Sequence, residues 1–320
     1  MAVYPNYQCT QFCYWLQNFS WLRLSGPQDA LVTIVYNAGL NSTSVTDQQW
    51  LNFNQFTAWR NKYYVIWRDY SNYFLPETIT WLSFLPTVPP FWYQVEINKL
   101  ISDLQGANIW NSLDRLFVFG APLSTTALYS IKNTSATPAT LVNSPTFTPY
   151  RGFTGNGATQ SINTQWNIST NSVNYTLNNA SFGAYALTSG LGASAGALIG
   201  GYLGSDFCRI NERYTGDSVR AGLNNATAYA SGTNTVTQGF FSGTRTASNL
   251  QTVYKNGISQ GTNSAVSTAL PNSNMFVLAG GNLAYSSNTV AIAFMGSGSI
   301  NQLTLYNILQ TFATRIGFNV

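Results

Sequence analysis

The sequence contains no histidine, and this absence excludes several kinds of active site. A Ser-His-Asp triad, a Cys-His pair and a histidine-ligated zinc each need an imidazole that this chain does not supply. Cysteine is also scarce, with three residues at Cys9, Cys13 and Cys208. Three thiols do not make a disulfide framework, although Cys9 and Cys13 could either pair locally or lie one helical turn apart. We expect plain buried thiols, no metal site and no cofactor.

Charge is the second scarcity, since only 8% of the residues are charged. The net charge is +4, and the excess lies in residues 151–320, which hold seven basic and three acidic side chains. These basic residues form no cluster, so we expect no nucleic-acid partner. No apolar stretch reaches the roughly 18 residues of a membrane span, and the first residues lack the pattern of a secretory signal. We therefore expect neither membrane insertion nor a signal peptide.

What the chain does contain is hydrophobic and neutral polar material. Hydrophobic residues make up 45% and aromatic residues 15% of its 320 positions. Because charges are few, Asn, Ser, Thr, Gln, Gly and Tyr must cover the surface, as is typical of β-rich extracellular or virion proteins. The length is sufficient for a full core and predicts two domains.

Tryptophan is concentrated at the N-terminal end, where residues 1–92 hold seven of the nine. This bias predicts a separate aromatic-rich domain over residues 1–92 and a second domain over residues 93–320. The aromatic side chains could fill the core of the small domain, or leave some rings for an interface with a subunit or partner. The proline-rich segment Leu85–Pro90 is the predicted linker.

Several elements are predicted near this linker. Thr46 to Arg60 is a candidate helix, in which Thr46 and Gln49 would form a capping box. After the linker, apolar residues recur at helical spacing from Val95 to Leu104, and Gly106 is placed to end that helix. Apolar, β-branched runs predict strands at residues 30–37, 63–69 and 79–84.

From Leu116 onward, short apolar or alternating segments are separated by Gly, Asn, Ser or Pro turns, which predicts a sandwich or jelly roll. Asn256-Gly257 between two extended segments predicts a type I′ hairpin. Asn301 to Ile316 has the apolar spacing of a closing helix. The predicted strands cover residues 116–121, 127–131, 140–144, 150–155, 160–168, 181–187, 196–204, 207–214, 218–224, 236–246, 250–254, 274–280 and 290–298.

Six segments between Val95 and Gly317 occur in a characteristic order. They are Asn108–Phe119, Val142–Phe147, Arg151–Gly157, Asn178–Ser181, Val253–Gly257 and the terminal helix with Leu305-Tyr306. This order resembles the concanavalin A-like (laminin G-like) jelly-roll domains of bacteriophage tail and fibre proteins. The resemblance implies a mainly β fold, namely a jelly-roll sandwich with flanking helices, in a virion. It does not extend to residues 1–92.

The same fold also carries glycoside hydrolases, which need two carboxylates about 5 to 9.5 Å apart. Residues 151–320 contain only Asp206, Glu212 and Asp217. Glu212 and Asp217 straddle a predicted loop, and with Arg209 and Arg213 beside them we expect local ion pairs. The acidic motif of laminarinase-like members is missing, and three scattered acids do not predict a calcium site. We therefore expect no catalytic residues and no enzyme activity.

Glycan binding fits this composition better, because aromatic faces and neutral hydrogen-bonding groups hold sugars. The predicted role is that of a bacteriophage virion structural protein, a tail fibre or receptor-binding component. Residues 1–92 would attach it to other virion proteins, and we expect a homo-oligomer, most simply a trimer. The alternatives are a capsid decoration or head-fibre protein and a polysaccharide depolymerase. The candidate glycan-binding residues are Trp166, Tyr202, Arg213, Tyr214 and Asn224.

Overall fold

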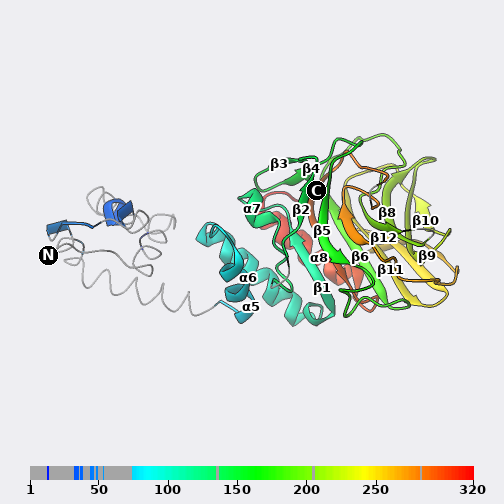
Figure 1. The fold of residues 1–320 in the computed structure, drawn as a ribbon, viewed down its shortest axis with the longest axis horizontal. Coiled ribbons are helices and arrows are strands. Elements are labelled where there is room, and N and C mark those ends of the chain that lie inside the picture. The colour runs from blue at the N-terminus through cyan, green and yellow to red at the C-terminus, as the bar shows by residue number, and fades with distance from the viewer. Residues whose placement is uncertain are drawn as a thin grey trace. The chain divides into compact units, whose positions relative to one another are not determined.

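The computed structural model describes two compact units, Met1–Phe74 and Leu75–Val320 (Figure 1). The described residues are 13, 32–35, 37–38, 44–46, 48–49, 53 and 74–320, without 135–136, 204–205 and 282. The division between the units falls earlier than the predicted boundary after residue 92. The reason is that the segment following Phe74 packs against the helix that comes after the proline-rich segment: the Leu75 backbone N–H donates to Asn98 Oδ1 at 2.7 Å, and Trp81 lies in the same core cluster as Ile97.

Two features of the first unit can be compared with the predictions. Residues 32–35 and 37–38 are helical, so the predicted strand at 30–37 is wrong. Val32, Val35 and Ala38 are buried at a three-residue spacing, which shows that this apolar run follows helical rather than alternating periodicity. The predicted strand at 63–69 lies outside the described residues, as does Cys9, whereas Cys13 is buried.

The capping box is confirmed. The Thr46 backbone N–H donates to Gln49 Oε1 at 2.9 Å, and the Gln49 backbone N–H donates to Thr46 Oγ1 at 3.2 Å. Residues 48 and 49 are helical, as expected just after an N-cap.

The second unit begins with two helices, α5 (Pro76–Phe84) and α6 (Phe91–Gly106). The strand predicted at 79–84 is therefore wrong, because Pro76 at the first helical turn and Glu77 behind it start a helix. Helix α6 is confirmed with its end at Gly106. Residues 85–90 are irregular, as predicted for proline-rich chain, but they connect two helices of one unit rather than two domains.

Two antiparallel sheets follow, which confirms the predicted mainly β sandwich with flanking helices. The eight-stranded sheet has the order β13 (Ile258–Asn263), β12 (Leu250–Lys255), β11 (Gly239–Ala247), β6 (Ala180–Ala186), β15 (Thr289–Gly296), β4 (Gly152–Thr154) and β3 (Thr146–Thr148), and β1 (Leu113–Val118) also pairs with β15. The seven-stranded sheet has the order β10 (Ala230–Thr233), β9 (Ser218–Asn225), β8 (Asp206–Tyr214), β7 (Ile199–Leu203), β14 (Asn274–Val277), β5 (Ser161–Asn167) and β2 (Thr140–Val142).

Local turn chemistry agrees with the predictions at one place and not at another. Asn256 and Gly257 have φ values of 50° and 75°, so the β12–β13 hairpin has the positive φ at both central residues that a type I′ turn needs. The strand predicted at 127–131 is wrong, since α7 (Ser124–Ala127) is followed by irregular chain. That chain touches β1 through single bonds, among them Ile131 N–H to the Leu116 carbonyl at 2.8 Å, and such contacts do not make a strand.

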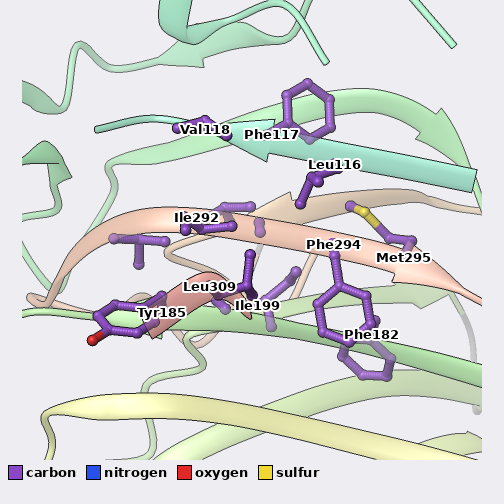
Figure 2. Packing of buried hydrophobic residues seen from close by; sticks show 14 of the residues in the cluster. Leu116, Phe117, Val118, Phe182, Tyr185, Ile199, Ile292, Phe294, Met295 and Leu309 are labelled. Atoms are coloured by element: carbon purple, nitrogen blue, oxygen red, sulfur yellow. The ribbon is translucent and has the colours of Figure 1, made fainter. Parts of the chain in front are cut away.

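The core lies between the sheets and under the closing helix α8 (Gln302–Ile316), as predicted (Figure 2). Side chains of both sheets and of α8, among them Phe182, Ile199 and Leu309, belong to one buried cluster. Each fully buried Leu, Ile or Phe side chain stabilises the fold by about 1.5–3 kcal/mol. Helix α8 is capped by Asn301, whose side chain accepts from the Thr304 N–H at 3.0 Å, and ends at Gly317 with φ 92°.

Within the described residues, no helix has the length and apolar character needed to cross a membrane.

Candidate functional site

The outer face of the seven-stranded sheet carries a cluster of arginine and aromatic side chains from β8, β9 and the chain just before β10. Alternation along the strands decides which residues reach it. A side chain at Gly243 of the opposite sheet would meet Ala221 and Leu223, so these two residues point into the sandwich. Their strand neighbours Arg220 and Gly222 therefore face outward. Gly222 pairs with Arg209 and Arg220 pairs with Asn211, which places Arg209 and Asn211 on the same outer face.

Four side chains of this face form a stacked column. The rings of Phe207 and Tyr229 lie 4.8 Å apart with an interplanar angle of 28°. The Arg220 guanidinium carbon lies 4.0 Å from the Tyr229 ring centroid and 3.1 Å from that of Tyr214. Arg220 is thus held between two tyrosine rings, an arrangement that combines cation–π attraction with planar stacking.

Arg209 lies beside the column and is joined to it. Its Nη2 donates to the Tyr229 hydroxyl, and its guanidinium carbon is 5.4 Å from the Phe207 ring centroid. Its Nε is buried and donates no hydrogen bond within the part of the chain that the structure describes. We define the Arg–Tyr cluster as Phe207, Arg209, Tyr214, Arg220 and Tyr229.

Asn211 anchors the cluster from below. Its Oδ1 accepts from Arg220 Nε at 3.0 Å, and its Nδ2 donates to the carbonyls of Ala195 at 3.1 Å and Gly196 at 2.6 Å. A buried amide with both ends occupied holds Arg220 in one orientation, because any movement would leave a buried polar group unpaired.

The electrostatics of the Arg–Tyr cluster are positive. Among the described side chains, no carboxylate lies within ion-pair distance of Arg209 or Arg220. A hydrogen bond from Thr215 and the neighbouring Arg220 charge lower the pKa of Tyr214 below its usual value, since both favour the phenolate. Burial lowers the pKa of Arg220, while Tyr229 and Tyr214 oppose that change.

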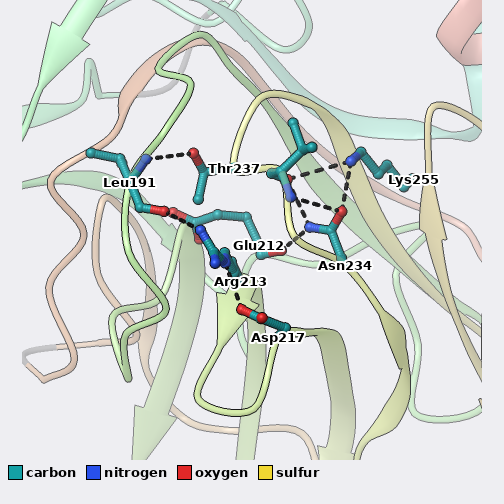
Figure 3. A network of polar contacts seen from close by, with 8 residues as sticks. Leu191, Glu212, Arg213, Asp217, Asn234, Thr237 and Lys255 are labelled. Carbon is teal, nitrogen blue, oxygen red and sulfur yellow. Dashed lines mark hydrogen bonds and ion pairs between the residues drawn. The ribbon is translucent and has the colours of Figure 1, made fainter.

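Three of the five predicted glycan-binding residues lie in or near this surface. Tyr214 belongs to the Arg–Tyr cluster. Tyr202 is 41% exposed and pairs with Phe207 across β7 and β8, so it lies on the same outer face. Arg213 is occupied: its Nε forms an ion pair with Asp217 at 2.8 Å, and its Nη1 donates to the Leu191 carbonyl at 2.7 Å (Figure 3).

The other two predicted residues are not surface loop residues. Trp166 is 1% exposed, and its Nε1 donates to the Asn171 carbonyl at 3.1 Å. Asn224 is 0% exposed, and its Oδ1 accepts from the Tyr175 hydroxyl and the Cys208 thiol, each at 2.9 Å. Trp166 lies on the buried face of β5. Asn224 has a φ of 54° at a point where the β8–β9 pairing shifts register, which interrupts the alternation and turns its side chain inward. The structure therefore brings neither residue to the cluster.

Sequence reasoning missed Phe207, Arg209, Arg220 and Tyr229. A signal was present in the alternation Phe207-x-Arg209-x-Asn211, which puts three non-aliphatic side chains on one face of a strand while Cys208 and Ile210 take the other. Tyr229 carried no comparable signal, because it lies in the irregular chain between β9 and β10 and meets Phe207 only through the fold.

The two candidate catalytic acids occupy separate environments. The predicted ion pair is confirmed for Asp217 with Arg213, but not for Glu212. The Glu212 carboxylate is buried, and its Oε1 accepts from Ser286 Oγ at 3.0 Å and Asn288 Nδ2 at 3.4 Å. Its Oε2 has no hydrogen-bond partner among the described residues, and burial raises the pKa of this carboxyl above its usual value. Figure 3 shows Glu212 and Asp217 in their surroundings.

A separate recess of about 390 Å³ lies at the start of α5, next to the 3₁₀ helix η1 (Trp110–Ser112). It is lined by Glu77, Trp110 and Lys132 among others, and the Lys132 ammonium lies 4.7 Å from the Trp110 ring centroid. Glu77 Oε1 accepts from Gln105 Nε2 at 2.9 Å. Within the described residues, no group of three or more His, Cys, Asp or Glu side chains could hold a metal ion.

No protein-family model and no curated protein sequence matches the chain. Among solved structures, the chain is similar to Trypanosoma rangeli sialidase in complex with sialic acid (13% identity, TM-score 0.46), covering 70% of this chain and 39% of the sialidase. It is also similar to domain 4 of AbnA, a GH43 extracellular arabinanase from Geobacillus stearothermophilus (10% identity, TM-score 0.41), covering 62% of this chain and 98% of that domain. A third similar structure is the botulinum neurotoxin serotype D binding domain (12% identity, TM-score 0.44), with 62% of this chain and 52% of that chain covered. At these scores the likenesses carry no argument about ligand or activity.

Proposed function

We propose that this chain is a bacteriophage virion structural protein, a tail fibre or receptor-binding component, whose sandwich contacts a glycan on the host surface. The observation that carries the glycan-binding part is the Arg–Tyr cluster with the exposed Tyr202 beside it. Saccharides bind to aromatic faces flanked by fixed hydrogen-bond donors, and this outer face offers both.

The virion context is supported by the composition and by the resemblance of residues 95–317 to phage tail and fibre jelly rolls. In this proposal residues 1–92 attach the protein to other virion proteins, and the chain acts as a homo-oligomer, most simply a trimer. The protein is then made in the host cytoplasm and displayed on the particle surface.

Binding is favoured over catalysis by the state of the two acids. A glycosidase needs a carboxylic acid and a second carboxylate that both reach the scissile bond. Glu212 is enclosed by Ser286 and Asn288, and Asp217 is held by Arg213. Neither presents a free carboxylate to a bound sugar in this arrangement.

The test is a glycan array and a host-cell binding assay on the full-length protein. We expect saturable binding that Y202A and Y214A each reduce at least tenfold. Y254A is the matched control, because Tyr254 lies on β12 of the other sheet. Equal binding by all four proteins would contradict the assignment of the site.

The same assays separate the alternative functions. Binding to purified phage particles but to no glycan would favour a capsid decoration or head-fibre protein. Release of reducing sugar from host polysaccharide, abolished by E212Q or D217N, would favour a depolymerase.

A further inference from the structure

We propose that the saccharide bound at the Arg–Tyr cluster is acidic, with a sugar carboxylate seated on the guanidinium groups of Arg209 and Arg220. This inference rests on the proposed glycan-binding function and specifies its ligand class. It is based on two observations: neutral and aromatic groups hold both guanidinium groups in place, and no described carboxylate pairs with either of them.

Both guanidinium groups are fixed without a described acid as partner. Arg220 is oriented by one hydrogen bond to Asn211 and by the rings of Tyr214 and Tyr229. Arg209 is oriented by the Tyr229 hydroxyl and the adjacent Phe207 ring. Aromatic rings and neutral groups thus position both cations, although elsewhere in the unit Arg213 and Arg315 are positioned by carboxylates.

Side chains held in this way are prepared for an anionic ligand. A guanidinium group has five N–H donors in a planar fork that matches the geometry of a carboxylate. Because the rings already restrict the rotamers, a ligand does not have to order two flexible side chains when it binds. Both arginines are partly exposed to solvent.

The aromatic residues favour a sugar as the carrier of the carboxylate. Tyr214 lies at the end of the column, and Tyr202 extends the same face by one strand with 41% of its surface exposed. A pyranose ring can stack on such a ring while its carboxylate reaches the guanidinium groups.

Two glycines, one in β9 and one just after β14, give this arrangement room. A Cβ atom at Gly280 would lie 2.6 Å from Arg209 Cδ, and one at Gly222 would collide with the Phe207 ring. Glycine at these positions therefore lets the arginine stem and the ring lie flat on the sheet.

Isothermal titration of the full-length protein tests the proposal with two matched ligands, trigalacturonic acid and neutral galactotriose. We expect the acidic trisaccharide to bind at least tenfold more tightly, with an advantage that decreases at higher salt. R220Q and R209Q should each bring the ratio of the two affinities close to one, whatever change they cause in the affinity for galactotriose. R151Q is the control, since Arg151 lies in the turn before β4.

Circular dichroism on each variant checks that it is folded, and R220K adds a second readout. Lysine keeps the charge but not the fork, so R220K should recover little of the preference. Equal affinity for the two trisaccharides would overturn the acidic-ligand proposal and leave the glycan-binding proposal standing. Absence of binding to every neutral and acidic glycan would overturn both. Tighter binding of a sulfated galactotriose than of trigalacturonic acid would overturn the carboxylate assignment.

Discussion

The outer faces of the two sheets both carry aromatic side chains, but one face is covered by a helix and the other is open to solvent. On the eight-stranded sheet, Tyr185 and Phe240 are buried beneath α8: the Phe240 ring stacks on Tyr306 at 6.3 Å, and the Tyr185 hydroxyl donates to Gln310. On the seven-stranded sheet, the corresponding face carries the Arg–Tyr cluster, whose arginines and tyrosines are partly open to solvent while Phe207 is buried. A covered face can be apolar throughout, whereas an open face needs polar or charged groups that water can solvate.

Stacked side chains contribute mainly to stability on the covered face and remain available for binding on the open face. Beneath α8 they add buried apolar area, which is the main source of stability. On the open face, rings and guanidinium groups shield each other while part of each remains available. We therefore expect substitutions on the covered face to affect stability first, and those on the open face to affect binding first.

The largest effect should come from Phe240→Ala on the covered face. Phe240 is fully buried, and truncation to alanine leaves a cavity beneath α8. We expect a loss of about 3–5 kcal/mol in the free energy of unfolding. Urea unfolding measures it, with Y229A on the open face as the comparison. A larger loss for Y229A than for F240A would break the distinction between the two faces.

A smaller effect is expected for Gly222→Ala on the open face. The added methyl group would collide with the Phe207 ring, which must move away from Tyr229. We expect a destabilisation of about 1–3 kcal/mol and a changed near-ultraviolet circular dichroism spectrum. Gly106→Ala is the matched control, because a Cβ there meets nothing within 4 Å. Identical spectra for G222A and the wild type would mean that the column does not depend on this glycine.

An element of the fold could be predicted from the sequence when residues close together in the chain determine its structure. The β12–β13 hairpin was predicted from Asn256-Gly257, and the capping box from Thr46 with Gln49. Helix α8 was predicted from the apolar spacing after Asn301. In each case a few neighbouring residues are enough to indicate the structure. The runs at 30–37 and 79–84 were not, since β-branched apolar residues satisfy a helix or a strand until their surroundings decide.

The candidate site was predicted only in part for a related reason. Tyr202 and Tyr214 could be proposed from residue type alone. Whether Trp166 and Asn224 face outward depends on the register of their strands, and a shift of one residue exchanges the two faces. The ring contact between Tyr229 and Phe207 joins two segments that are separated in sequence by all of β9, and no local pattern encodes it.

Between the two faces, Glu212 offers a test of the interior by pH. Burial raises the pKa of this carboxyl above its usual 4.5, so folding favours the protonated form. The resulting stabilisation is fully present below pH 4.5 and is lost as the pH rises through the folded-state pKa. E212Q should therefore raise the thermal unfolding midpoint at pH 8 and leave it nearly unchanged at pH 4. An equal shift at both pH values would show that Glu212 is not protonated on folding.

The smallest effect should belong to Asp217→Asn, which removes the surface ion pair with Arg213. The two side chains are 46% and 21% exposed, so water and salt already weaken their attraction. Arg213 also keeps its hydrogen bond to the Leu191 carbonyl, which holds it in place without the acid. We expect a loss of at most about 1 kcal/mol, decreasing further in high salt. Urea unfolding at low and high salt measures it, and a loss comparable to that of F240A would mean that this ion pair supports the sandwich as strongly as the covered face does.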